Sequence, residues 1–202
     1  MKLARATLAV VCLLLIGVTS DSATTRKVLL RVDQAPLAWG DCRIADQLTQ
    51  QLTRSGSIEV KRISDDYRPS FPNDSYNLDS LVNWGLESGG RYLLLVDVHR
   101  EGLERRKDWV LPLIFHRWVT VGVIEGELRL IDLNRARSLV AEPFRVERKA
   151  KGAFQASIDD NANDPDIHLS APEKVRFFAM LEQALCDQIT THVDRYAHNG
   201  GR

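Results

Sequence analysis

Asp97 and His99 are the residues whose types and spacing come closest to a catalytic pair. They stand two apart in Arg91–His99, RYLLLVDVH, a segment with the composition of a strand. Alternate residues of a strand point to the same face, so the carboxylate and the imidazole would lie together as an acid/base site. The same spacing also suits a strand end that reaches solvent. A small hydrolase that uses Asp97 and His99 is therefore the enzymatic alternative.

Other catalytic signatures are absent from the sequence. It contains no nucleophile elbow of the Gly-x-Ser-x-Gly type, no phosphate-binding glycine loop and no His-Glu-x-x-His pair. The histidines fall on unrelated segments without the spacing of metal ligands: His99, His116, His168, His192 and His198. We therefore predict a protein that is not an enzyme and that uses no cofactor.

Oxygen-bearing side chains crowd into the segment from Asp159 to Asp166, DDNANDPD. Such ligands suit calcium, but an EF-hand loop also needs a glycine and a terminal glutamate, which this segment lacks. We expect a solvated, turn-rich loop and predict no metal site. A calcium-dependent module is the alternative.

Trp109–Trp118, WVLPLIFHRW, places two tryptophans, a phenylalanine and four aliphatic residues in ten positions. It follows the charged run His99–Asp108, in which the signs are mixed and for which we expect a solvated hairpin tip. Pro112 argues against a regular central strand. One interpretation folds the stretch over the sheet as a lid, and the other leaves it exposed to a protein partner or a membrane surface. The candidate partner-binding residues are Trp109, Leu111, Ile114, Phe115 and Trp118.

The amino terminus has the layout of a secretory signal peptide. Lys2 and Arg5 precede an apolar core from Ala6 to Val18, and small residues follow it. This core is too short for a comfortable membrane span. Cys12 lies inside the core and lacks the preceding small residue that lipid attachment requires. We therefore predict a cleaved leader over residues 1–22 and a periplasmic or secreted protein.

Charge and cysteine content agree with an exported protein that binds no nucleic acid. Removing Lys2 and Arg5 leaves 25 basic against 27 acidic residues, without the basic excess of nucleic-acid-binding proteins. Cys42 and Cys186 are the two cysteines beyond the leader. In an oxidising compartment such a pair can form a disulfide, here between the first and last predicted helices. The alternative is two small buried residues that never meet.

Hydrophobic periodicity predicts alternating strands and helices in the first half. Lys27–Asp33 and Ile58–Ser64 have the pattern of strands, and Arg91–His99 that of a central strand. A helix between Asp41 and Gly56 and another between Asn77 and Gly89 separate them; Asp41 and Asn77 are good N-caps, and Gly56 and Gly89 stand where the helices should stop.

The second half predicts an antiparallel meander and a closing helix. Two or three strands without a helix between them run from Trp118 to Ala150, with a polar turn at Asn134–Arg137. Ser170–Glu173 is a capping box before a helix that runs to about Arg195. Its predicted inward face is Val175, Phe178, Leu181, Leu185, Ile189 and Val193. We predict one α/β (α+β) domain over residues 23–198, with a single mixed sheet ordered β-α-β-α-β, meander, helix, and a disordered tail over 199–202.

This order, together with two local motifs, resembles a group of cell-envelope proteins. The motifs are Gly89-Gly90-Arg91 before the central strand and the hairpin turn at Asp132–Asn134. The group contains the amino-terminal domain of TolB, the curli secretion component CsgG and the lipoprotein activators of penicillin-binding proteins. The turn lacks the group's usual glycine, and the chain lacks its lipid-attachment cysteine. The resemblance implies a non-catalytic envelope protein that binds a protein partner, for instance in envelope assembly or secretion.

Overall fold

The structure is a computed structural model, and it describes most of the chain from Arg26 onward. The described residues are 26–34, 43–54, 56–63, 77–111, 115–150 and 169–199, and for 108–111, 115–118 and 197–199 the backbone alone is described. Within these ranges no helix is long and apolar enough to cross a membrane.

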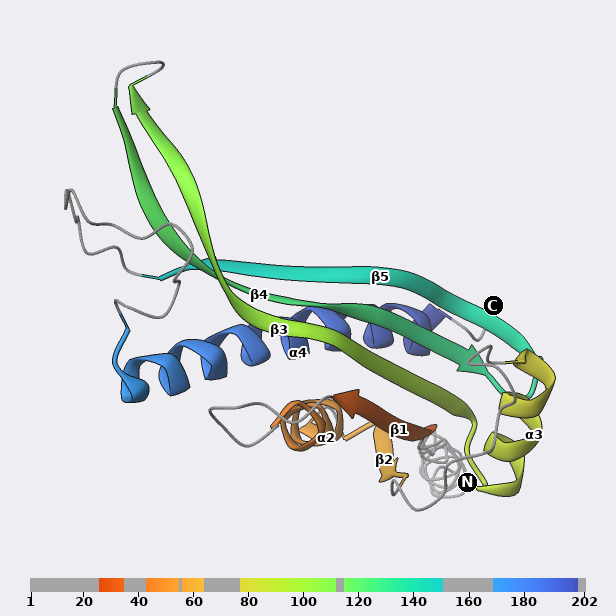
Figure 1. Ribbon diagram of the computed structural model, residues 1–202. Coiled ribbons are helices and arrows are strands. Elements are labelled where there is room, and N and C mark those ends of the chain that lie inside the picture. The colour runs from red at the N-terminus through yellow and green to blue at the C-terminus, as the bar shows by residue number, and fades with distance from the viewer. Residues whose placement is uncertain are drawn as a thin grey trace, which may run out of the picture.

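One mixed sheet organises the domain, as the sequence predicts (Figure 1). Its strands are β1 (Arg26–Gln34), β2 (Ile58–Arg62), β3 (Tyr92–Leu111), β4 (Phe115–Asp132) and β5 (Arg137–Lys149), and its helices are α2 (Ile44–Arg54), α3 (Leu78–Glu87) and α4 (Ala171–Asn199). The spatial order is β2-β1-β3-β4-β5. β1 is parallel to both β2 and β3, whereas β4 is antiparallel to β3 and β5.

Helices cover both faces of the sheet. Strand residues such as Val28, Leu94 and Leu130 pack with α2 and α4 in the larger core, whereas Leu93 and Ile131 pack with α3 in the smaller one. β1 and the first part of β3 are therefore apolar on both faces, which is the usual condition of strands inside a parallel sheet. This explains the unbroken apolar sequence at the start of β3.

α3 and α4 begin where their capping residues predict, whereas α2 begins at Ile44, three residues after the predicted cap Asp41, which lies outside the described residues. The Asn77 side chain accepts a hydrogen bond from the Asp79 amide at 3.0 Å. The Glu173 carboxylate accepts from the Ser170 amide at 2.9 Å and from its hydroxyl at 2.6 Å. Each contact satisfies an amide that the first turn of a helix leaves unpaired.

The prediction for the inward face of α4 was wrong at one position. Val175 is 47% exposed, and Phe177 is buried with Phe178 in its place. The cause is the close approach of α4 to β4 at Gly122. A Cβ atom on Gly122 would stand 2.4 Å from the Phe177 ring, so the missing side chain makes room for that ring.

β3 is much longer than predicted. The sequence analysis ended it at His99 and placed a hairpin tip in the charged run, but the run continues as strand to Leu111 and pairs with β4. The pairing is interrupted between Val98 and Arg100 by a bulge. Gly126 permits this bulge, because a Cβ atom there would stand 2.0 Å from the Asp97 carbonyl oxygen. β3 is therefore paired with β4 as far as Leu111, opposite Phe115.

β5 forms one edge of the sheet, and Pro143 lies near its middle. The Ala150 amide donates to the Thr120 carbonyl at 2.9 Å. Counting from this pair, every second residue of β5 is hydrogen-bonded to β4, and the residues between have their amides directed outward. Pro143, opposite Glu127, therefore occupies a position whose nitrogen faces away from β4. The proline removes a donor from the outer edge and none from the ladder.

Candidate functional site

The β3–β4 hairpin continues beyond the sheet as a two-stranded arm. β1 pairs with β3 only as far as Val98, and β5 pairs with β4 only from Val121 onward. Beyond these points Arg105–Leu111 pairs with Phe115–Thr120, with the hydrogen bond from Ala150 to Thr120 at its base, and Figure 1 shows this part projecting from the body of the molecule. At roughly 3.3 Å per residue the arm reaches roughly 20 Å. We call Arg105–Leu111 and Phe115–Thr120 the arm.

The hydrophobic stretch Trp109–Trp118 forms the far end of the arm. The register pairs Trp109 with His116 and Lys107 with Trp118, so the two tryptophan positions are diagonal neighbours on one face of the ribbon. Leu111 pairs with Phe115, and Ile114 lies outside the described residues. The described backbone thus runs away from the sheet and not back over it, unlike the lid interpretation. Four of the five predicted partner-binding positions, Trp109, Leu111, Phe115 and Trp118, therefore lie on the outer part of the arm, and their binding role stays a prediction.

A network of ion pairs holds the base of the arm on the face opposite α4. Arg106 of β3 donates to Glu147 of β5 through Nη1 at 2.8 Å and Nη2 at 3.0 Å, and to Glu104 through Nε at 3.0 Å. Arg145 pairs with Glu125 and Glu147. Hydrogen bonds from Arg106 and then Arg145 lower the pKa of Glu147 to about 2. Acidic and basic side chains of the charged run His99–Asp108 are thus paired with side chains of opposite charge on another strand.

Beneath this network lies a stripe of valines that neither helix layer reaches. Val119, Val121 and Val123 alternate along β4 and are at most 7% exposed. Glu104 and Arg106 are opposite Val121 and Val119 on β3. Long arginine side chains commonly cover apolar surface with their methylene groups while their charged ends stay in water. Since an isolated two-stranded ribbon is only marginally stable in water, this small core stabilises the base of the arm.

Asp97 and His99 do meet, as their spacing predicts. His99 Nε2 lies 3.3 Å from Asp97 Oδ2, and both side chains are about half exposed (51% and 41%). Asp33 of β1 pairs in register with Asp97, and Arg31 holds Asp33 through Nε at 2.9 Å. Among the described residues no third group forms a hydrogen bond with the Asp97–His99 pair. The arrangement is that of a solvated strand end with acid/base residues on it.

A buried carboxyl pair, which sequence reasoning missed, lies on the opposite face where β1 ends. Gln34, the last residue of β1, donates to Glu101 Oε2 at 2.7 Å. Glu182 of α4 is 3% exposed and accepts from the Arg43 amide at 3.5 Å, at the start of α2. Burial, and then the neighbouring Glu182, raise the pKa of Glu101 to about 7; burial also raises that of Glu182. Glu101 is thus hydrogen-bonded to the last residue of β1, and Glu182 to the residue that precedes α2.

Cys186 lies one turn further along α4 as a buried free thiol. Its Sγ is 3.8 Å from the Ile44 carbonyl oxygen, and burial raises its pKa to about 12. Cys42 lies outside the described residues, so the structure contains no disulfide within the ranges it describes. The Cys42–Cys186 bond remains a prediction.

Two further features are the candidate calcium segment and a surface groove beside α3. The oxygen-rich segment Asp159–Asp166 lies outside the described residues, and the residues that are described contain no group of three metal-ligating side chains. A shallow groove of about 470 Å³ runs between the first turn of α3, at Leu78 and Leu81, and the Arg129–Pro143 region of β4 and β5.

No protein-family model matches the chain, and no curated protein matches its sequence. Solved structures that it resembles are bacterial lipoproteins and envelope proteins. Uncharacterized lipoprotein B from Nitrosomonas europaea is 14% identical, with 87% of this chain and 86% of that chain covered and a TM-score of 0.42. Rare lipoprotein B from Shewanella oneidensis is 11% identical, with 88% and 100% covered and a TM-score of 0.43. TolB from Acinetobacter baumannii is 14% identical, with 59% and 23% covered and a TM-score of 0.33.

Proposed function

We propose that this chain is a non-catalytic, exported component of the bacterial cell envelope that binds a partner protein through the tip of its arm. The observation that carries the proposal is the arm itself, which extends past both neighbouring strands and places the stretch Trp109–Trp118 at its far end. Aromatic residues are enriched at the centres of protein interfaces.

The composition of the arm supports a binding role. Its shaft has the charged residues Arg105, Arg106 and Lys107, whereas its end has two tryptophans and a phenylalanine. An apolar centre with a charged surround is the usual anatomy of a specific interface. Export is supported by the leader over residues 1–22, which is of the kind that directs a chain across the inner membrane.

The test is site-specific photo-crosslinking in the envelope. A photoreactive phenylalanine analogue replaces Trp109 or Trp118 in the arm or, as a control, Val175 or Met180, which are exposed on α4. We expect a discrete adduct from the arm positions alone, identified by mass spectrometry. The identified partner is then purified and its affinity measured.

The affinity measurement uses matched triple variants. Trp109→Ser, Ile114→Ser and Phe115→Ser together should weaken binding at least tenfold, as loss of interface anchors does. Leu86→Ser, Val175→Ser and Met180→Ser remove exposed apolar side chains elsewhere and should leave the affinity within about twofold. Equal affinities of the two triple variants would exclude the arm as the binding surface.

A second candidate function is a small periplasmic hydrolase, favoured by the 3.3 Å contact between His99 and Asp97. Under that function His99→Ala abolishes turnover in a panel of ester, amide and phosphate substrates and leaves partner binding unchanged. No turnover by the native protein on the panel removes this candidate.

A further inference from the structure

One end of the sheet carries basic residues on β1, β2 and β5, just before β3 and just after β4. Arg26 and Lys27 begin β1, and the Arg91 amide donates to the Lys27 carbonyl at 2.9 Å. The Arg91 carbonyl in turn accepts from Leu133 at 3.0 Å, in the turn that contains Arg135 and leads to Arg137. Lys61 of β2 reaches the Ser88 carbonyl at 3.3 Å at the end of α3. We define the basic end as Arg26, Lys27, Lys61, Arg91, Arg135 and Arg137.

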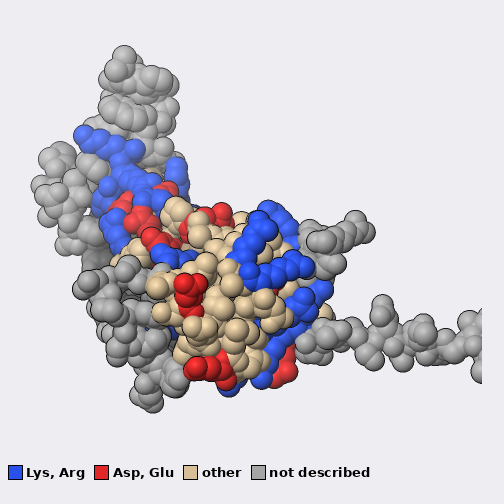
Figure 2. Space-filling view, turned by 90° about the vertical axis from the view of Figure 1, so that its right-hand side faces the viewer, with Lys and Arg blue, Asp and Glu red and all other residues tan. Residues whose placement is uncertain are grey.

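Acidic groups compensate this charge only in part. Asp132 is 2% exposed, and its Oδ1 accepts from the Asn134 and Arg135 amides at 3.1 and 3.2 Å. Among the described residues, Glu59, opposite Lys27 in register, and Glu87 of α3 are exposed carboxylates at this end, and Arg135 Nε lies 4.0 Å from Asp132 Oδ2. Figure 2 shows blue side chains gathered beside the tan surface at this end of the molecule. The end therefore carries an excess of positive charge, although the whole chain is neutral.

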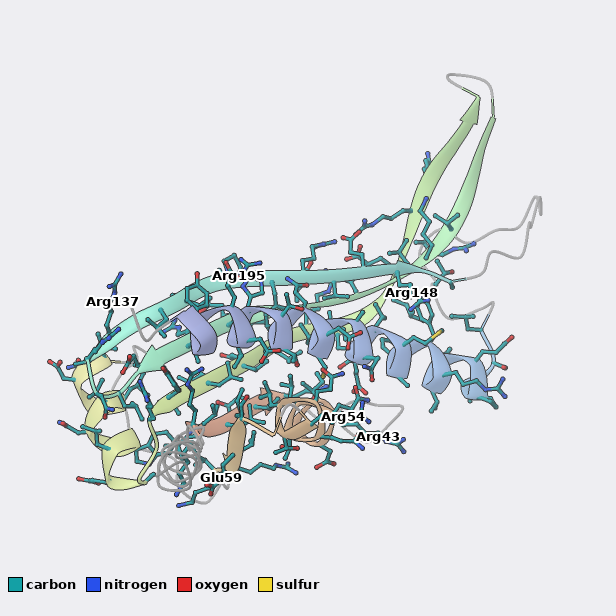
Figure 3. All side chains as sticks on the ribbon, turned by 180° about the vertical axis from the view of Figure 1, so that it is seen from behind. Arg43, Arg54, Glu59, Arg137, Arg148 and Arg195 are labelled. Atoms are coloured by element: carbon teal, nitrogen blue, oxygen red, sulfur yellow. The ribbon has the colours of Figure 1, made fainter. Side chains whose placement is uncertain are left out.

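The basic end lies opposite the arm along the same strand. Arg91 immediately precedes β3, and Leu111 is its last residue, 20 residues of strand later. In Figure 3, Arg137 is labelled at the end of the molecule away from the arm, whereas Arg148 lies at the base of the arm. The full length of β3 therefore separates the two surfaces, roughly 65 Å at 3.3 Å per residue.

The chain also enters the sheet at this end. Arg26 is the first residue of β1, and the apolar leader core Ala6–Val18 joins it through a few residues. The end that a membrane-engaged leader holds nearest the bilayer is thus the basic one. Lys and Arg side chains are attracted to an anionic lipid surface, and clusters of several are the usual recognition element.

We propose that the basic end docks on anionic phospholipid headgroups of the envelope. This surface is separate from the arm, and docking by it directs the arm away from the bilayer. Attraction of this kind depends on lipid charge and is screened by salt.

The test is binding of residues 21–202 to lipid vesicles, since every described element lies between Arg26 and Asn199 and the leader would itself insert. Vesicles contain either phosphatidylcholine alone or phosphatidylcholine with about 30 mol% phosphatidylglycerol. We expect binding to the anionic vesicles alone, falling at least tenfold between about 50 and 300 mM salt. Equal binding to neutral vesicles would overturn the proposal.

Matched charge reversals locate the surface. Lys61→Glu, Arg135→Glu and Arg137→Glu together should weaken binding at least tenfold. Arg43→Glu, Arg54→Glu and Arg148→Glu make the same change in net charge at exposed positions outside the basic end and should cost no more than about twofold. Equal losses from the two variants would show a response to net charge only, and the proposal would fall.

Two further variants keep the result interpretable. Arg135→Gln with Arg137→Gln, which perturbs folding least, should give an intermediate loss, and circular dichroism checks that each variant is folded. The arm variant Trp109→Ser, Ile114→Ser, Phe115→Ser should bind vesicles as the native protein does. If the arm variant loses binding and the basic-end variants keep it, the lipid contact belongs to the arm tip and this proposal is wrong.

Discussion

Arg106 on β3 reaches across β4 to Glu147 on β5, and both terminal nitrogens of its guanidinium hydrogen-bond the same carboxylate, at 2.8 and 3.0 Å. The pair connects two strands that are not neighbours in the sheet. Its span passes over the valines of β4, which links the polar surface of the arm base to the small core beneath it.

The coupling between Arg106 and Glu147 should be measurable by a double-mutant cycle. Both side chains are about one-third exposed, so we expect a coupling free energy of about 0.5–1 kcal/mol in urea unfolding. The control is Arg62 with Asp46, which are 53% and 69% exposed and should couple by about 0.3 kcal/mol or less. Because the folded-state pKa of Glu147 is depressed, its contribution is present above pH 4.5 and is lost as the pH falls toward 2. Equal coupling in the two pairs would contradict a special role for this bridge.

Replacing Gly126 with alanine should destabilise the protein strongly. The added Cβ would meet the Asp97 carbonyl oxygen at 2.0 Å, and because that atom belongs to the backbone the clash cannot be relieved by a rotamer change. We expect a loss of about 2–4 kcal/mol in the free energy of unfolding. Gly102→Ala is the matched control, since nothing lies within 4 Å of its added Cβ; it should change stability by less than about 0.5 kcal/mol. Similar losses for both glycines would argue against the bulge at Val98–Arg100.

Glu101 should make the protein less stable as the pH rises from 4.5 to 7. Its folded-state pKa of about 7 lies above its ordinary value of 4.5, so the folded state binds the proton more tightly in that window. The stabilisation is complete below pH 4.5 and is lost as the pH passes 7, by about 1–2 kcal/mol after allowance for partial solvent screening.

The measurement is urea unfolding across this pH range. Glu101→Gln should remove most of the slope while keeping a hydrogen-bonding group opposite Gln34. Glu59→Gln changes an exposed carboxylate on β2 and should leave the slope as it is. The charged and titratable group beside Glu101 is Glu182, which itself neighbours Arg43 and Cys186. A slope that survives in Glu101→Gln assigns the proton elsewhere among them.

A disulfide between Cys42 and Cys186 remains our prediction for protein isolated from an oxidising compartment. The Cys186 sulfur already lies against the carbonyl of Ile44, two residues beyond Cys42. Intact-mass analysis under denaturing, non-reducing conditions should show a mass about 2 Da below that of the reduced chain, and no alkylation without reductant. Cys42→Ser should leave one thiol that reacts only after unfolding, because Cys186 is buried. Two alkylated thiols in the native chain would rule the bond out.

Local signals in the sequence predicted the parts of the fold that depend on local chemistry. The caps at Asn77 and Ser170 and the apolar start of β3 each follow from a few adjacent residues. The length of β3 could not be predicted in this way, since its charged half is stable as strand only when β4 and β5 supply the opposite charges. One signal was present: Arg100, Glu104 and Arg106 lie at even spacing, as residues of one strand face do.

The candidate sites also separate into contacts that neighbouring residues predict and contacts that only tertiary packing creates. Asp97 and His99 are two apart, and their contact could be predicted. Glu101 and Glu182 come from elements 81 positions apart, and neither has a distinctive neighbour in the sequence. Only the packing of α4 beside the end of β1 brings them together.

Pro143 limits what can join this molecule side by side. A strand from a second copy that paired with the outer edge of β5 would find no amide donor at Pro143, near the middle of the strand, and would contact its pyrrolidine ring. Growth of a continuous sheet from copy to copy is therefore discouraged along β5.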